Sequence, residues 1–138
     1  MKKIIFALLV VMVLFVGCNN GKLKAGVYEA ETVLSDSTAT VKVTVDADGK
    51  IAAVYFDETY DDTTKKALGD DYGMKSDWGS QIGEWYEQVA ALENAIVENQ
   101  GVAFITLDDK GKTDVVSGCT IQIDHLVKTF NDAIAKAK

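Results

Sequence analysis

The segment TVKVTVDADGKIAAVYF, residues 40–56, decides the fold, because a turn signal separates two runs rich in apolar residues. Valines recur at every second position from 41 to 45, which is the period of a strand that buries one face. The DADG sequence at 46–49 supplies turn residues, and its glycine can take a positive φ. Residues 51–56 then form the returning strand. The segment therefore predicts an antiparallel hairpin.

Further strands are expected on both sides of this hairpin. Residues 27–34 alternate as a strand does, and the short runs 102–107 and 113–116 also predict strands. Residues 57–78 are polar, contain two glycines and show no apolar period, so we expect an irregular loop there. The short connections around the hairpin favour an antiparallel meander.

Two helices are expected after the hairpin. Ser80 can cap a helix over residues 81–97, which Gly101 would end. Its apolar residues recur at spacings of three and four and so share one face: Ile82, Trp85, Val89, Leu92 and Ile96. The chain closes with a second amphipathic run whose apolar face comprises Ile121, Ile123, Leu126, Val127, Phe130 and Ile134. The predicted fold is α+β, an antiparallel β meander packed against an amphipathic helix, with a C-terminal helix.

The first residues have the pattern of an export signal. Lys2 and Lys3 precede an apolar run that is shorter than the roughly 20 residues needed to span a bilayer. We therefore expect a cleaved signal peptide at 1–17, a polar tether at 18–25 and one domain at 26–138. The sequence FVGC, ending at Cys18, resembles a bacterial lipobox. That resemblance implies a lipidated Cys18 and an anchor on the extracytoplasmic face of the cell membrane, although a secretory signal with an incidental cysteine stays open.

Charge and cysteine content exclude several classes of function. Removing Lys2 and Lys3 would change the formal charge from -7 to -9, which opposes binding to nucleic acid through a basic surface. A lipidated Cys18 leaves Cys119 alone, so no internal disulfide can form. The single histidine, His125, has no companion ligands for a metal site and is expected on a polar helix face.

The sequence DVVSGCT at 114–120 combines a carboxylate, two hydroxyls and a glycine just before the last helix. A helix N-terminus binds phosphate well, but the same residues also make an ordinary helix cap and turn. The chain has no arginine and no glycine-rich phosphate loop, so a noncovalent nucleotide site is poorly supplied. A covalent link would remove that need.

DVVSGCT resembles the flavinylation motif of the FMN-binding domain family, in which Asp, two variable residues, Ser or Thr, Gly, a small residue and Thr precede a helix. The resemblance implies that Thr120 carries FMN through a phosphoester. Asp114 would be recognised during attachment or would orient the loop, and Ser117 would bind the phosphate or cap the helix. Gly118 would allow close backbone approach. Cys119, where the family usually has Ala, would pack as a small apolar residue, while oxidation of its thiol beside a flavin stays open as an alternative.

Residues 67–93, ALGDDYGMKSDWGSQIGEWYEQVAALE, are similar to a segment of extracellular electron-transfer flavoproteins of Gram-positive bacteria. The similarity implies an electron carrier whose partners are a flavin transferase, which uses FAD and Mg²⁺, and a quinone-linked membrane dehydrogenase. Trp78 and Tyr72 are candidates for stacking on the flavin ring, whereas Trp85 belongs to the core stripe.

Two other classes of function stay open from the sequence. The first is a lipoprotein module that binds a ligand or a surface partner and never carries flavin, with DVVSGCT at 114–120 serving only as a cap. The second is a flavin-dependent reductase. Against an enzyme, the sequence indicates no convergent acid and base of the kind that a reaction centre needs.

Overall fold

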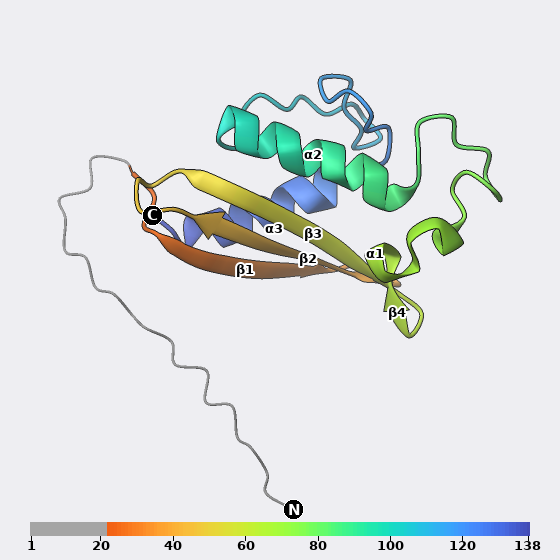
Figure 1. Ribbon diagram of the computed structural model, residues 1–138, viewed down its shortest axis with the longest axis horizontal. Helices are drawn as coiled ribbons and strands as arrows, with labels where there is room; N and C mark the ends of the chain where they lie inside the picture. Colours follow the sequence, from red (N-terminus) through yellow and green to blue (C-terminus); the bar gives the residue numbers. More distant parts are fainter. Residues whose placement is uncertain (1–21) are drawn as a thin grey trace, which may run out of the picture.

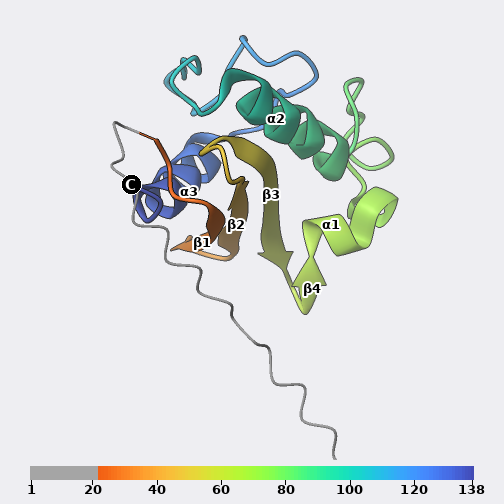
Figure 2. The ribbon, with the colours of Figure 1, turned by 60° about the vertical axis from the view of Figure 1, so that its left-hand side comes forward.

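The computed structural model describes residues 22–138, so the expected signal peptide and Cys18 lie outside the described residues. The strands form one antiparallel sheet in the order β1-β2-β3-β4. The two long helices cover the same face of this sheet, α3 over β1 and β2 and α2 over β3 (Figures 1 and 2). The elements are β1 (Gly26–Val33), β2 (Thr38–Val45), β3 (Ile51–Tyr60), β4 (Thr63–Thr64), α1 (Lys65–Leu68), η1 (Gly69–Tyr72), α2 (Trp85–Asn99) and α3 (Asp124–Ala135).

The hairpin of residues 40–56 holds the centre of the sheet, as its pattern predicts. Val43 of β2 lies opposite Tyr28 of β1 and Val54 of β3, so one face of three strands is apolar. Polar residues take the opposite face in the next register position, where Lys42 pairs with Glu29. This alternation is typical of an antiparallel sheet with one solvated face. The α+β fold class is confirmed.

The predicted strands 102–107 and 113–116 are absent, and residues 101–123 form an irregular loop. The reason lies at the free edge of β3, where side chains from α2 and its C-cap already form hydrogen bonds with the backbone N–H and C=O groups of the strand. Glu93 accepts a hydrogen bond from the Phe56 N–H, and the Gln100 carboxamide bonds both the N–H and the C=O of Ile51. A further strand at this edge would have to displace these bonds.

Helix α2 begins later than its apolar pattern predicts. Ser80 does not cap it; Glu84 is the N-cap residue and forms a capping box with Glu87. Ile82 therefore precedes the helix and is 51% exposed, whereas the other members of the stripe are buried. The sequence pattern gave no warning, because the Ile82 spacing fits the helical period as well as a true core position does.

The expected loop at 57–78 contains more regular structure than its composition predicts. β3 continues to Tyr60, and the short β4, α1 and η1 follow. Asp57 organises this turn, because its carboxylate accepts bonds from the Thr64 hydroxyl and the Lys66 N–H. Local side-chain bonds of this kind can replace an apolar period as the source of order.

Glu84 fixes the loop that follows η1. Its buried carboxylate accepts bonds from the N–H groups of Met74 and Lys75. Gly73 has a φ of 84°, and a Cβ there would lie 2.6 Å from an Asp77 carboxylate oxygen, so the turn requires glycine. The loop that carries Trp78 is therefore fixed by the bonds to Glu84 and by the tight turn at Gly73.

The last helix, α3, starts at Asp124 rather than directly after Thr120. Ile121 and Ile123 precede the helix, although both pack with the core. Its N-cap residue is Ile123, and no side chain caps it, so the expected capping role of Ser117 is wrong. None of the helices within residues 22–138 has the length and apolar character needed to cross a membrane.

Candidate functional site

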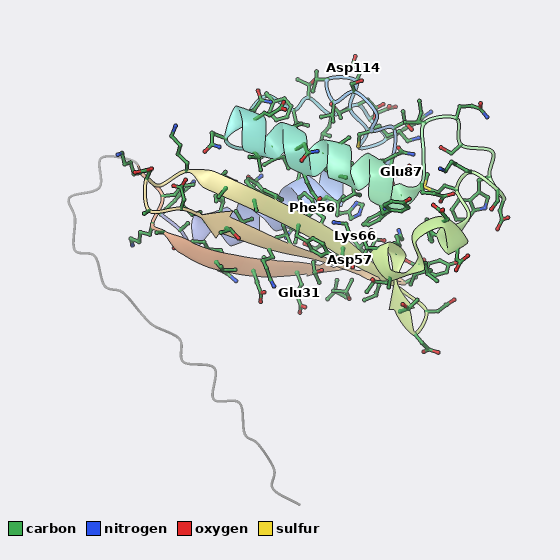
Figure 3. All side chains as sticks on the ribbon, viewed as in Figure 1. Glu31, Phe56, Asp57, Lys66, Glu87 and Asp114 are labelled. Atoms are coloured by element: carbon green, nitrogen blue, oxygen red, sulfur yellow. The ribbon has the colours of Figure 1, made fainter. Side chains whose placement is uncertain are left out.

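The loop of residues 101–123 crosses over α2 on the side that faces away from the sheet (Figure 1). It places the motif residues at the surface, and Figure 3 shows Asp114 on this loop beyond α2. Asp114, Ser117 and Thr120 are exposed. Asp114 and Ser117 form no side-chain hydrogen bond or ion pair within residues 22–138, so both are accessible to a partner.

Thr120 is held by one residue of α2, Gln88. The Thr120 N–H and hydroxyl both donate to Gln88 Oε1, at 2.8 and 3.1 Å. Gln88 is fully buried, and its Nε2 donates to the carbonyl of Gly83 at 3.0 Å. The side chain of an exposed residue is thus tied to a buried residue of α2.

The other two motif residues explain how the loop turns. Gly118 has a φ of 79°, which favours glycine, while a Cβ there would meet only Ala91 at 3.7 Å. Backbone conformation, more than close approach, therefore requires this glycine. Cys119 is buried in the core, as expected for a small apolar residue, and burial raises the pKa of its thiol to about 11. The thiol stays protonated and unreactive near neutral pH.

The backbone amides of the motif do not form a helix-terminus phosphate site. The Cys119 N–H bonds the carbonyl of Val116, and the Thr120 N–H bonds Gln88. Thr120 instead lines an open depression of about 480 Å³, which we call the threonine groove. The groove includes one cation, Lys112, and is lined by Thr106, Leu107, Asp108, Lys112, Thr113, Asp114 and Thr120.

A second depression, the aromatic cavity, has a volume of about 470 Å³. Tyr72, Trp78 and Trp85 line it together with Ile121, the residue after Thr120. The rings of Tyr72 and Trp78 meet edge to face at 5.2 Å, and Trp78 is 61% exposed. The structure brings Tyr72 and Trp78 together, and Trp85, expected in the core, lines the same cavity.

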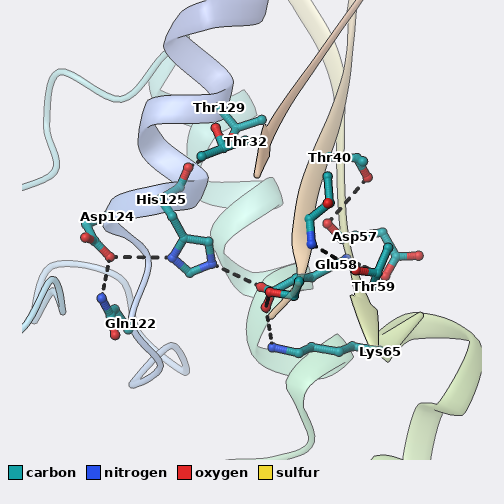
Figure 4. A network of polar contacts seen from close by, with 12 residues as sticks. Thr32, Thr40, Asp57, Glu58, Thr59, Lys65, Gln122, Asp124, His125 and Thr129 are labelled. Atoms are coloured by element: carbon teal, nitrogen blue, oxygen red, sulfur yellow. Dashed lines mark hydrogen bonds and ion pairs between the residues drawn. The ribbon is translucent and has the colours of Figure 1, made fainter. Parts of the chain in front are cut away.

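Figure 4 shows a buried ionic cluster around Glu58. The cluster lies beside the aromatic rings, because Glu58, Lys65 and His125 line the same cavity. Glu58 of β3 is 5% exposed and accepts bonds from Lys65 Nζ at 2.7 Å and from His125 Nε2 at 3.0 Å. The Ser37 hydroxyl donates to the same carboxylate at 2.9 Å. Lys65 also lies 5.3 Å from the ring centroids of both Tyr72 and Trp85. The cluster joins four segments of the chain and the aromatic rings.

The cluster shifts the titration of two of its members. Burial alone would raise the pKa of Glu58, but bonds from His125 and Lys65 outweigh it and lower that pKa to about 2. Burial alone would lower the pKa of His125, but its bond to the Glu58 carboxylate outweighs burial and raises that pKa above its usual 6.5. The pair therefore favours an ionised carboxylate and a protonated imidazole.

Sequence reasoning missed Glu58, Lys65 and Gln88. Glu58 and Lys65 fell in the segment expected to be a loop, and Gln88 is a polar residue one position before Val89 on the core stripe. His125 was expected on a polar helix face, whereas it is half-buried against Glu58. A warning signal was available only for Gln88, because a polar residue beside a buried stripe must find partners.

No group of three or more His, Cys, Asp or Glu side chains within residues 22–138 is arranged to hold a metal ion.

This α+β domain presents a motif threonine between a polar groove and an aromatic cavity. The family model of the FMN-binding domain matches residues 36–135, which is most of the chain. The chain therefore belongs to the FMN-binding domain family and is a flavin-binding protein with FMN as its cofactor. No curated protein and no solved structure matched the chain.

The residues at the site fit FMN. A flat isoalloxazine gains from aromatic faces, which Tyr72 and Trp78 supply in the aromatic cavity. A phosphate gains from a cation, and Lys112 lines the groove beside Thr120. Thr120 lines one depression and the next residue, Ile121, lines the other.

The ionic cluster makes stability depend on pH in two windows. A raised His125 pKa stabilises the fold below pH 6.5, the unperturbed value, and this stabilisation is lost as the pH rises through the raised pKa. The lowered Glu58 pKa stabilises the fold above pH 4.5, and this stabilisation is lost as the pH falls towards about 2.

Urea unfolding measured across pH should show that the free energy of unfolding declines at both acid and alkaline pH. His125→Gln should abolish the alkaline decline, and Glu58→Gln should reduce stability at pH 6 by about 3 kcal/mol.

Asp132→Asn serves as the control for this prediction, because it removes only the exposed pair with Lys128. Exposed pairs of this kind contribute about 0.5 kcal/mol. The pH profile of this variant should follow the wild type. An alkaline decline that persists in His125→Gln would contradict the assignment to the cluster.

Proposed function

We propose that the protein is a lipid-anchored, extracytoplasmic electron carrier with FMN bound covalently to Thr120. The observation that carries the proposal is the placement of Thr120, an exposed hydroxyl in a flavinylation-like motif, fixed by Gln88 beside an aromatic cavity. A phosphoester at Thr120 replaces the binding free energy that the chain, with no arginine, does not supply through noncovalent phosphate contacts.

Attachment depends on a separate flavin transferase that uses FAD as donor and needs Mg²⁺. Its access is supported by the exposure of Asp114, Ser117 and Thr120 on one loop outside the sheet and α2. Asp114 is then a residue that the transferase recognises, because its carboxylate is engaged by no group within residues 22–138.

The aromatic cavity is the proposed site of the isoalloxazine. On α2, Gln88 contacts Thr120 and Trp85 lines the cavity, three residues earlier. This spacing is a rise of about 4.5 Å on one side of the helix. A group tethered at Thr120 therefore has the cavity within reach, where Tyr72 and Trp78 exclude water from its faces.

Localisation and partners follow from the sequence of the first residues. Lipidation of Cys18 would place the domain on the outer side of the cell membrane, near a quinone-linked membrane dehydrogenase as electron donor. Bound FMN would accept the electrons and pass them on. The ring would lie close to the surface, because Trp78, which lines the proposed ring site, is itself exposed.

A flavin-dependent reductase is a second candidate, because the aromatic cavity contains the acid and base pair that the sequence did not indicate. His125 and Glu58 line it and lie 3.0 Å apart. In a reductase, His125 would supply a proton to a substrate held in the cavity.

Covalent attachment is tested by intact mass after co-expression with a flavin transferase. We expect the wild-type protein to gain the mass of one FMN and Thr120→Ala to gain none, because the acceptor oxygen is absent. Ser117→Ala is the matched control, since it removes the other exposed hydroxyl of the motif and leaves the acceptor. Flavin addition that persists in Thr120→Ala would overturn the assignment of the acceptor.

The ring site is tested by flavin fluorescence of the loaded protein. Trp78→Ala should raise the emission about two-fold or more, because stacking on tryptophan quenches flavin and is worth about 1 kcal/mol. Leu107→Ala is the control, since Leu107 is also exposed but lines the threonine groove. The reverse pattern, a rise with Leu107→Ala alone, would place the ring in the groove.

Carrier and reductase are separated by turnover. Membranes that contain a quinone-linked NADH dehydrogenase should bleach the visible flavin absorbance of the loaded protein to completion, and a ferric acceptor should restore it. Soluble NADH with organic acceptors should give no sustained turnover. Sustained turnover that His125→Ala abolishes would instead favour the reductase.

A further inference from the structure

Gln88 is a polar side chain on the buried face of α2, next to Val89 of the core, and it is 0% exposed. A buried carboxamide needs hydrogen-bond partners, because a buried polar group without them destabilises the fold. Within residues 22–138, Gln88 meets this requirement through bonds to two segments, the Gly83 carbonyl before α2 and Thr120 of the motif loop. The carboxamide orientation is therefore fixed by bonds at both of its ends.

This orientation determines where the Thr120 hydroxyl points. The hydroxyl proton is directed inward to Gln88 Oε1 at 3.1 Å, and the N–H bond of the same residue to the same atom, at 2.8 Å, prevents the loop from rotating away. A hydroxyl has one proton and two lone pairs. With the proton directed inward, the lone pairs of Thr120 Oγ1 are left towards the exposed side, where the threonine groove opens.

The neighbouring hydroxyls of the loop are not held in this way. Ser117 is exposed, and its hydroxyl has no hydrogen-bond partner within residues 22–138. Thr113 is buried, and its Oγ1 accepts a bond from the Val115 N–H, which occupies a lone pair. Of these three residues, only Thr120 combines exposure with a hydroxyl proton fixed on a buried acceptor.

We infer that Gln88 is the positioning residue that selects Thr120 as the flavin acceptor, by holding its hydroxyl with the nucleophilic side outward in the folded, unmodified protein. The inference rests on the proposed covalent attachment. Thr120 Oγ1 attacks the FMN phosphorus of FAD, so that an Oγ1–P bond forms, the pyrophosphate P–O bond breaks and AMP leaves. During the attack the hydroxyl proton leaves its bond to Gln88 Oε1 and passes to a base of the transferase, because a neutral carboxamide does not take it up. In the ester the Thr120 N–H bond to Gln88 remains and keeps the loop in place.

The test compares rates of FMN attachment with purified transferase, FAD and Mg²⁺, measured by intact mass. Gln88→Leu, which keeps the size of the side chain and removes its acceptor, should slow attachment about 10-fold to 100-fold. Gln88→Glu, which keeps an oxygen acceptor for both Thr120 donors, should recover part of the rate. In the unloaded protein, hydrogen exchange at the Thr120 N–H should become faster in Gln88→Leu, while the amides of β2 stay protected.

Gln100→Asn is the matched control. Gln100 is the other carboxamide that ties α2 to a distant backbone, through Ile51, and asparagine tolerates its positive φ of 57°. This variant should lose stability but attach FMN at the wild-type rate.

Three outcomes would overturn the inference in distinguishable ways. A wild-type protein that gains no FMN removes the proposed attachment itself and the inference with it. Wild-type rates in Gln88→Leu would leave the attachment standing and remove the role of Gln88. Equal slowing in Gln88→Leu and Gln100→Asn would show that general loss of stability, and not positioning, governs the rate.

Discussion

The docking of α2 against β3 is the interaction on which the rest of the structure depends. Glu93 and Gln100 replace a neighbouring strand along the free edge of β3, so the helix closes the sheet as well as covering its face. Glu93 is itself paired with Lys66, which lies over the ring of Tyr55, so the same contact orders the start of α1. The N-terminal half of α2 can then hold the functional loops.

That half of α2 organises both sides of the site. Glu84, at its start, binds the backbone of the loop that carries Trp78, and Gln88, one turn later, binds the loop that carries Thr120. Trp85 lies between them and lines the aromatic cavity. Polar side chains from one helical turn therefore help to fix two long loops relative to each other. The site residues lie on loops, but their bonds to α2 hold them against a rigid element, which preorganises the site.

The sequence predicted the parts of the fold that depend on periodic burial. The hairpin of residues 40–56 and the stripe of α2 from Trp85 to Ile96 have regular spacings, and both are present. It failed where polar bonds decide the structure. The runs 102–107 and 113–116 have strand composition, but the edge that they would need is occupied by Glu93 and Gln100, and no local pattern reports this.

The candidate site likewise contains residues that local sequence patterns indicated and residues that only the fold brought together. The motif residues were readable from DVVSGCT at 114–120, and the loop aromatics Tyr72 and Trp78 from their composition, because each is a local signal. Glu58, Lys65, His125 and Gln88 act through partners far along the chain, so their roles required the fold. His125 shows this best, since its partner Glu58 lies 67 positions away.

The separation between Gln88 and Thr120, 32 positions, has a consequence for the order of events in the life of the protein. A short peptide with the motif lacks this contact, and so does a chain that has not yet folded. If Thr120 is the acceptor, as proposed, its contact with Gln88 exists only after α2 has docked, and cofactor attachment would follow folding. For a chain that crosses a membrane unfolded, maturation would belong to the far side. The bound flavin would then mark those molecules that had reached their native structure.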